Sequence, residues 1–468
     1  MVLYHAGDAP LLLTDPWLVG SVYWRSWWLQ NYPTPEELDW LGKSAIVYVT
    51  HEHPDHFHMP SIRRLGAAPE YLFPALTERG FLAHMARNGF RADVLPPLTW
   101  RALADDVSIL SIPMWNDDSL LLVDTRSALI INLNDAKPLP PVLKAIQRFV
   151  CARAKPTLLL CSYSPASLIN SFSDADGMIR LKEPRQYVDY ASRLCDLLGA
   201  NFYLPFASQA VFNREDSVWA NDYRTSWEDL ERYWTARARL LPPYVTLDLG
   251  DFSCEHLPPS RYRAADPAAI TARTRARMKA ENETIIEDSD VAGLAKKLNA
   301  FRWLWMPIFP RGFAFALGER ILNYNPFRGI LAKAAEPAGD FVVAVPKLTA
   351  KEAIRNNHLS DLGITMFVRV RLLRRIDPRK VYALFVMFAF DDYRHLAGPR
   401  AFLRWLWSGI RFTFGLRLPV PTNEEKRDRR KWKHLSSFPH PSIRAQERKS
   451  RESDVRLPLD PRLRGGDE

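Results

Sequence analysis

One short histidine-rich segment constrains the fold of this chain more than any other feature. Residues 50–58 read T-H-E-H-P-D-H-F-H, and they hold four of the 11 histidines among 468 residues. The segment follows the apolar run 45–49, whose β-branched and aromatic side chains predict a buried strand. Residues 60–65 have the pattern of the first turns of a helix. The sequence therefore predicts a strand-to-helix loop on which polar side chains converge.

The side chains of this loop have the chemistry of metal ligands. Neutral imidazole nitrogen and carboxylate oxygen are the ligands that zinc and similar divalent ions prefer. We therefore predict a metal site formed by His51, His53, Asp55 and His56, with Asp55 also a candidate proton acceptor in catalysis. His58 lies beyond the motif, and we expect it at the surface or behind the ligands. The alternative interpretation is a solvated polar turn that happens to be rich in histidine.

The spacing H-x-H-x-D-H of this loop resembles the signature of the metallo-β-lactamase superfamily. The resemblance implies an α+β fold, the αββα sandwich of that superfamily. It also implies that His51 and His53 bind one metal ion and that Asp55 and His56 bind a second. Three further ligands are expected later in the chain, namely a histidine, a bridging aspartate and a final histidine.

These later ligands are only partly present. Asp135 follows an apolar run and lies where the bridging aspartate is expected, although a turn or helix-capping aspartate fits the same position. The third ligand should lie within 113–118, which has no histidine, so Asp118 or Asn116 is the candidate, and a simple turn is the alternative. Ala207 stands where the final histidine is expected. A single zinc or iron ion is therefore as consistent with the sequence as a pair of ions.

Further blocks, in the same order, resemble the CMP-N-acetylneuraminate hydroxylase family over roughly residues 3–400. These blocks are 14–20, 27–29, 124–125, 205–207, 246–250 and 361–364. Members that hydroxylate the sugar nucleotide begin with a Rieske domain, whose [2Fe–2S] cluster needs C-x-H and C-x-x-H. Cys254 and His256 form one C-x-H, but none of the four cysteines has a histidine at the C-x-x-H spacing, so the ligand set of such a cluster is incomplete. The resemblance therefore implies that hydroxylation would need a separate ferredoxin or Rieske protein.

Periodicity predicts two folded units, a helical connector and a disordered basic tail. The first unit alternates strands with helices and is expected to form the sandwich; the last is a smaller α+β domain without a catalytic cluster. The sandwich, connector, C-terminal domain and tail are expected at 1–255, 256–285, 286–422 and 423–468. In the C-terminal domain, the predicted strands of an antiparallel sheet are 340–346, 364–373 and 380–390.

Charge and composition indicate which kinds of molecule this chain can bind. Of the net charge of +10, the tail contributes +4 through 13 Lys/Arg and nine Asp/Glu, so the rest of the chain carries +6. This surplus suits the steering of an anionic substrate, and we expect no nucleic-acid partner. No apolar stretch reaches the roughly 18 residues of a membrane span. The lack of a secretory signal and of a disulfide framework predicts a cytoplasmic protein.

Residues 401–418 interleave aromatic residues with arginines. This pattern predicts a helix that packs its aromatic side chains on the second domain, and the alternative is a basic amphipathic helix at a membrane surface.

Three functions remain open at this point. The first is a metal-dependent hydrolase that acts on a small anionic substrate through a metal-activated water. The second is an oxygenase component that needs iron and a separate electron donor. The third is a metal-binding protein without turnover.

Overall fold

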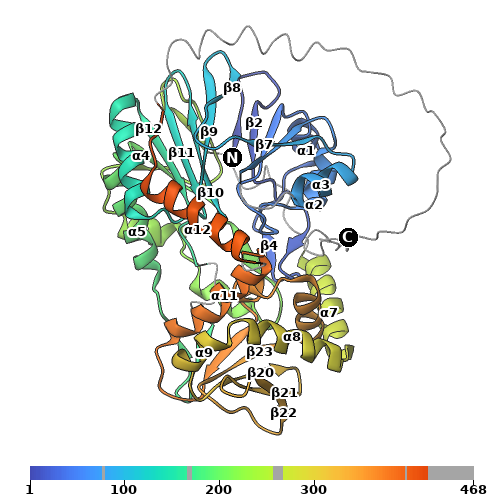
Figure 1. The fold of residues 1–468 in the computed structure, drawn as a ribbon. Coiled ribbons are helices and arrows are strands. Elements are labelled where there is room, and N and C mark those ends of the chain that lie inside the picture. Colours follow the sequence, from blue (N-terminus) through green and yellow to red (C-terminus); the bar gives the residue numbers. More distant parts are fainter. Residues whose placement is uncertain (76–79, 166–170, 257–266, 396–397, 420–468) are drawn as a thin grey trace, which may run out of the picture.

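The N-terminal part of the computed structural model is built on two β-sheets (Figure 1). The structure describes residues 1–75, 80–165, 171–256, 267–395 and 398–419. The first sheet has the order β1-β2-β5-β6-β7, from Val2–Leu3, Leu12–Thr14, Ile46–Tyr48, Glu70–Pro74 and Ala92–Leu95. The second has the order β17-β15-β12-β11-β10-β9-β8, from Arg239–Leu240, Phe202–Pro205, Thr157–Cys161, Leu129–Asn134, Ser119–Asp124, Val107–Pro113 and Arg101–Ala104.

Helices cover the outer face of each sheet. Those that pack on the first sheet are α1 (Pro35–Leu41), α2 (Met59–Leu65) and α3 (Gly80–Arg87). Those that pack on the second are α4 (Pro140–Arg153), α5 (Pro184–Leu198) and α6 (Trp227–Tyr233). Figure 1 shows the two groups on opposite sides of the sheets. The order of layers is therefore helix, sheet, sheet, helix.

Successive side chains of β5 point alternately into the core between the sheets and toward the outer helices. Ile46 and Tyr48 lie in the core between the sheets, whereas Val47 and Val49 pack against the outer helices. Successive side chains of a strand point to opposite faces, so a strand with both faces covered must be apolar throughout. This explains why the run 45–49 has no polar residue, and it confirms the predicted αββα sandwich.

Two small sheets complete the N-terminal part. Their strands are β3 (Ser21–Val22), β4 (Trp27–Leu29) and β16 (Ala210–Phe212) in one, and β18 (Val245–Leu247) and β19 (Cys254–His256) in the other. A 3₁₀ helix, η2, spans Val218–Tyr223.

The C-terminal part has its own sheet with the order β14-β13-β24-β23-β20-β21-β22. These strands are Met178–Ile179, Phe172–Ser173, Arg369–Leu372, Phe341–Val345, Phe313–Leu317, Arg320–Asn325 and Ile330–Ala334. The helices here are α7 (Pro267–Glu283), α8 (Asp288–Ala300), α9 (Arg302–Ile308), α10 (Lys347–Asn356), α11 (Tyr382–Asp392) and α12 (Pro399–Phe414). Since β13 and β14 lie within the predicted N-terminal domain, that stretch of chain contributes two strands to the C-terminal sheet, and the predicted domain limits stay a prediction.

One predicted strand of the C-terminal domain is wrong. Residues 380–390 form the end of a 3₁₀ helix, η5 (Pro378–Val381), and most of α11. Nearly every residue of the run is apolar, so its period could not separate helix from strand. Asp377 favours helix over strand at this point, because its side chain caps the first helical turn by accepting a hydrogen bond from the backbone of Arg379.

The other two predicted strands are confirmed. The runs 340–346 and 364–373 contain β23 and β24, which pair antiparallel. The sheet as a whole is mixed rather than antiparallel, because β20 and β23 run parallel. The predicted connector contains α7, and the predicted tail lies outside the described residues. No helix in the described ranges combines the length and apolarity needed to cross a membrane.

A buried cluster of charges joins the two parts. The guanidinium of Arg214, which is fully buried, donates to both carboxylate oxygens of Glu281 on α7 at 3.0 and 2.7 Å. Arg277, also on α7, donates to Glu281 and to Glu352 of α10 at 3.0 and 2.6 Å. Glu352 also accepts from the indole of Trp24 in the N-terminal part at 2.7 Å. Each buried charge in this cluster thus has a partner of opposite charge, which offsets the free-energy cost of removing the charge from water.

We predict that Glu281→Gln destabilises the protein by about 3 kcal/mol, because it removes one of the two carboxylates that pair with buried Arg214, the other being Asp216, and the same carboxylate also pairs with Arg277. Urea unfolding at neutral pH measures the loss. The matched control is Glu283→Gln, an exposed carboxylate on the same helix, which should cost less than about 1 kcal/mol. Equal losses in the two variants would contradict the prediction. Burial raises the pKa of Glu281, but the hydrogen bonds and charge of Arg214 outweigh this effect and lower it. The stability that Glu281 contributes is therefore present at neutral pH and is lost on acidification, as the carboxylate becomes protonated.

Candidate metal centre

The histidine loop lies where the strand ends of the two sheets meet. Asp15 follows β2 and Thr50 follows β5, and because these strands are parallel their carboxyl ends lie at one edge of the first sheet. Asn134 and Asp135 lie at the end of β11, and Asp118 lies directly before β10, both in the second sheet. Polar residues distant in sequence therefore share one edge of the sandwich.

Three side chains form a cluster with metal-ligand geometry. His51, His56 and Asp135 each bring one ligand atom into a group whose members all lie within 4.8 Å of one another. The ring centroids of His51 and His56 are 4.0 Å apart, and Nε2 of His56 is 3.3 Å from a carboxylate oxygen of Asp135. Two imidazole nitrogens and a carboxylate oxygen suit zinc or iron(II). The donor set therefore fits a divalent metal ion.

His53 lies beside this cluster. Its Nδ1 is 2.8 Å from Nε2 of His51, so the two imidazoles face each other, as the resemblance implied for a shared ion. Its other nitrogen, Nε2, is 3.4 Å from the hydroxyl of Tyr393 in the C-terminal part. His53 thus connects the cluster to the second unit, and its role as a ligand stays a prediction.

Asp55 lies on the other side of the cluster. One carboxylate oxygen is 3.2 Å from Nε2 of His56, and the other accepts a hydrogen bond of 2.7 Å from the hydroxyl of Tyr23. Although burial opposes it, His56 lowers the pKa of Asp55 to about 2. Asp55 and Asp135 in turn raise the pKa of His56 against the effect of burial. The structure therefore brings Asp55 and His56 together, which is the second pairing that the resemblance implied.

Asp118 contacts the opposite side of His51. Its carboxylate is 3.4 Å from Nδ1 of His51, whereas Nε2 of that ring faces His53. The same oxygen of Asp118 accepts a hydrogen bond of 2.7 Å from the backbone of Ser119. Asp118 is absent from the cluster of three that the described residues form. The hydroxyl of Thr50 is nearer to the same nitrogen of His51, at 3.0 Å. This geometry fits a hydroxyl and a carboxylate that together orient the candidate ligand His51 from behind.

Asp15, Thr50 and Asn134 form a hydrogen-bonded network that sequence reasoning missed. Asp15 accepts hydrogen bonds of 2.8 Å from both the backbone and the hydroxyl of Thr50. The side-chain nitrogen of Asn134 is 2.8 Å from Asp15 and 2.9 Å from Nδ1 of His56. Both Asp15 and Asn134 adopt a positive φ, which short polar side chains tolerate. The available signal was their position: each follows or ends a buried apolar strand.

His58 is buried, and its Nδ1 is 2.8 Å from the hydroxyl of Ser61 at the start of α2. It therefore lies behind the loop, one of the two places expected. Asn116 is exposed in the turn between β9 and β10.

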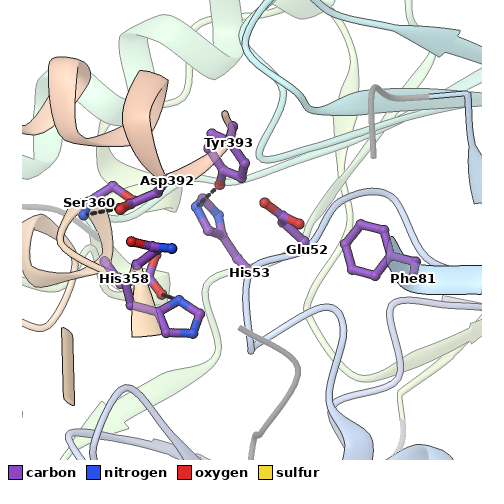
Figure 2. Close-up of a pocket in the computed structure, with 9 residues that line it drawn as sticks. Glu52, His53, Phe81, His358, Ser360, Asp392 and Tyr393 are labelled. Atoms are coloured by element: carbon purple, nitrogen blue, oxygen red, sulfur yellow. Dashed lines mark hydrogen bonds and ion pairs between the residues drawn. The ribbon is translucent and has the colours of Figure 1, made fainter. Parts of the chain in front are cut away.

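A pocket opens on the His53 side of the cluster, between the two parts (Figure 2). Its empty space of about 330 Å³ includes solvent at its open mouth. Glu52, His53 and Phe81 line it from the sandwich, and the C-terminal part supplies Asn357, His358, Ser360, Asp361, Asp392 and Tyr393. The C-terminal part, in which the sequence showed no catalytic cluster, therefore supplies most of the pocket wall.

Comparisons with known proteins bear on this site. No protein-family model matches the chain. The chain is 22% identical, over 278 residues, to the inactive cytidine monophosphate-N-acetylneuraminic acid hydroxylase of Homo sapiens, covering 52% of this chain and 51% of that protein. It is 40% identical over 55 residues to the corresponding hydroxylase of Asterias rubens, covering 12% and 8%. The chain thus spans about half the length of the human relative, and the predicted resemblance is confirmed at low identity.

Two solved structures are also similar. An isothiocyanate hydrolase from Delia radicum gut bacteria is 15% identical with a TM-score of 0.37, over 55% of this chain and 95% of that one. A mutant of CmlA beta-hydroxylase is 15% identical with a TM-score of 0.33, over 51% of this chain and 50% of that one.

We predict that His56→Ala abolishes retention of metal through dialysis, because the cluster loses one of its three donors. Elemental analysis for zinc and iron, on the purified full chain and the variant, measures this. His5→Asn is the matched control, since His5 is an exposed histidine paired with Asp106 at 3.7 Å. Metal content that is unchanged in His56→Ala would show that the cluster does not hold the ion.

Asp118→Asn tests the orienting role. We expect the apparent metal affinity to fall about 10–100-fold while the number of ions bound at saturation stays the same. A competitive chelator titration gives both quantities. A lower number of ions at saturation would instead make Asp118 a direct ligand.

Proposed function

We propose that this protein is a metal-dependent hydrolase that acts through a metal-activated water on a small anionic substrate. The observation that supports this most is the convergence of His51, His56 and Asp135 beside a pocket formed by both units. Buried ligands next to an accessible polar pocket are the usual arrangement of a catalytic metal site rather than a purely structural one.

A bound zinc or iron ion would polarise the substrate and lower the pKa of a coordinated water toward about 7. The protein's own residues prepare the ligands for this. Burial lowers the pKa of His51, so that imidazole is neutral and its lone pair is available. Asp55 is deprotonated at neutral pH, which suits a ligand. Its low pKa makes it a weak base, so we favour the ligand role for Asp55 over the predicted role of proton acceptor.

Tyr393 is the residue of the C-terminal part that we place in the site. Its hydroxyl lies 3.4 Å from His53, and burial raises its pKa well above the usual value. The phenol therefore keeps its proton and acts as a hydrogen-bond donor, toward His53 or toward negative charge that develops on the substrate. The pocket also contains Glu52, Asp361 and Asp392, so an anionic substrate group would have to face the metal and the imidazoles.

An oxygenase component is the second candidate, and the similarity to the curated hydroxylases favours it. It would need iron in the cluster and an electron donor. Cys151, Cys161, Cys195 and Cys254 are all free thiols, which fits the proposed cytoplasmic location, and a separate ferredoxin or Rieske protein would supply the electrons. A metal-binding protein without turnover is the remaining alternative.

The hydrolase proposal predicts turnover of a generic ester or phosphodiester without any reductant. Activity should disappear on chelation and return with zinc or iron. Tyr393→Phe should lower kcat about tenfold at unchanged metal content, because only the phenolic hydroxyl, the hydrogen-bond donor, is lost. Release of p-nitrophenol from model substrates measures these rates, and His5→Asn serves as the control. Turnover that occurs only with iron and an electron donor would replace the hydrolase by the oxygenase, whereas metal binding without turnover would leave the non-catalytic alternative.

A further inference from the structure

Helix α12 carries a stripe of large apolar side chains on its solvent side. Leu403, Trp407, Ile410 and Phe414 are 60%, 68%, 44% and 74% exposed. They follow the spacing i, i+4, i+7 and i+11, which places them on one side of a helix with 3.6 residues per turn. Leu406 and Phe402 are exposed next to this stripe. Single exposed apolar residues are ordinary, but a continuous stripe of this kind marks an interaction surface.

The opposite side of α12 already has its packing partners. Trp405 contacts the rings of Phe390 and His395, and its indole donates a hydrogen bond of 2.9 Å to the backbone of Trp115. Phe412 is buried. Trp405 and Phe412 are seven residues apart and lie about half a helical turn away from the exposed stripe. Trp405 thus makes the predicted contact with the second domain through Phe390, but the same helix also lies against Trp115 and α4 of the sandwich. The exposed stripe is a separate face of the helix. Figure 1 shows α12 running across the outside of the ribbon.

Four arginines lie beside the stripe. Arg400, Arg404 and Arg411 fall on one flank of the helix, and Arg417 follows its end; all four are exposed. Within the described ranges none of them forms an ion pair, and residues 399–418 contain no acidic side chain. The local charge of +4 is thus uncompensated along this surface.

We propose that α12 is an interfacial helix that binds an anionic lipid surface. A Trp, Phe, Leu and Ile stripe flanked by arginines is the composition of helices that lie in the plane of a membrane interface. The apolar side chains would enter the boundary between headgroups and acyl chains, and the arginines would meet lipid phosphates. Docking of a second copy through this face is disfavoured, because a two-fold contact would bring the arginines of both copies together.

The test is sedimentation of the full chain with vesicles of phosphatidylcholine alone and with vesicles that also contain phosphatidylglycerol. We expect binding only to the anionic vesicles, weakened by salt. The double variant Trp407→Ser with Phe414→Ser should lower the partition coefficient about tenfold or more. Arg404→Gln with Arg411→Gln should lower it while leaving the apolar stripe intact.

The matched control is Trp303→Ser, because Trp303 on α9 is 67% exposed, almost the same as Trp407. It should bind vesicles as the unmodified chain does. Circular dichroism and metal content of each variant show whether it is folded. Absence of binding, equal binding to uncharged vesicles, or undiminished binding of the Trp407→Ser, Phe414→Ser variant would overturn the proposal. The last result would assign binding to another segment, such as the basic stretch 426–433. Concentration-dependent self-association that the same substitutions abolish would replace the lipid by a second copy.

Discussion

The contact on which the site depends is the hydrogen-bonded network of Asp15, Thr50, Asn134 and His56. Asp15 and Thr50 belong to loops of the first sheet, and Asn134 ends a strand of the second, so the network joins the two sheets at the edge where the ligands lie. A buried carboxylate is tolerated only when donors satisfy it, and Asp15 has donors from both Thr50 and Asn134. Because Asn134 also contacts His56, the same network that satisfies the carboxylate sets the orientation of a ligand. The site is thus held in place before any ion binds.

A second constraint acts at the junction of the two units. Arg214 is fully buried and pairs with Asp216 of its own unit and with Glu281 of α7, so this ion pair favours the arrangement in which the N-terminal part meets α7. That arrangement brings Tyr393, just past the end of α11, beside His53 of the histidine loop. Pockets between units are common sites of ligand binding because each unit can supply different chemistry to one cavity. Here the sandwich supplies the candidate metal ligands, and the C-terminal unit supplies most of the residues that line the pocket.

The pattern of apolar residues along the sequence predicted those strands and helices whose formation depends mainly on neighbouring residues. The strand before the histidine loop and the helix after it followed from local apolar patterns. The αββα sandwich was implied by the family resemblance, and the structure confirms it with strands that have both faces covered. The run 380–390 failed for the opposite reason: almost all of it is apolar, so only the capping by Asp377 and the surrounding packing select a helix. At the site, Asp118 shows that a sequence can name a residue without giving its contact. Asp118 was predicted as a candidate ligand, but which ring nitrogen of His51 it faces depends on the relative positions of β10 and β5.

By itself, the sequence determined the chemistry of the loop: three imidazoles and a carboxylate at a fixed spacing after a buried strand. This chemistry depends only on neighbouring residues, because a tight loop after a rigid strand restricts the positions that its side chains can adopt. The family resemblance pointed to Asp135, but only the tertiary structure showed that it meets the loop, with the Asp15 and Asn134 network behind it and Tyr393 across the pocket. Asn134, Asp135 and Tyr393 are 78, 79 and 340 residues away from the loop histidines that they contact. Contacts at such separations arise from the packing of whole layers, which no local pattern encodes.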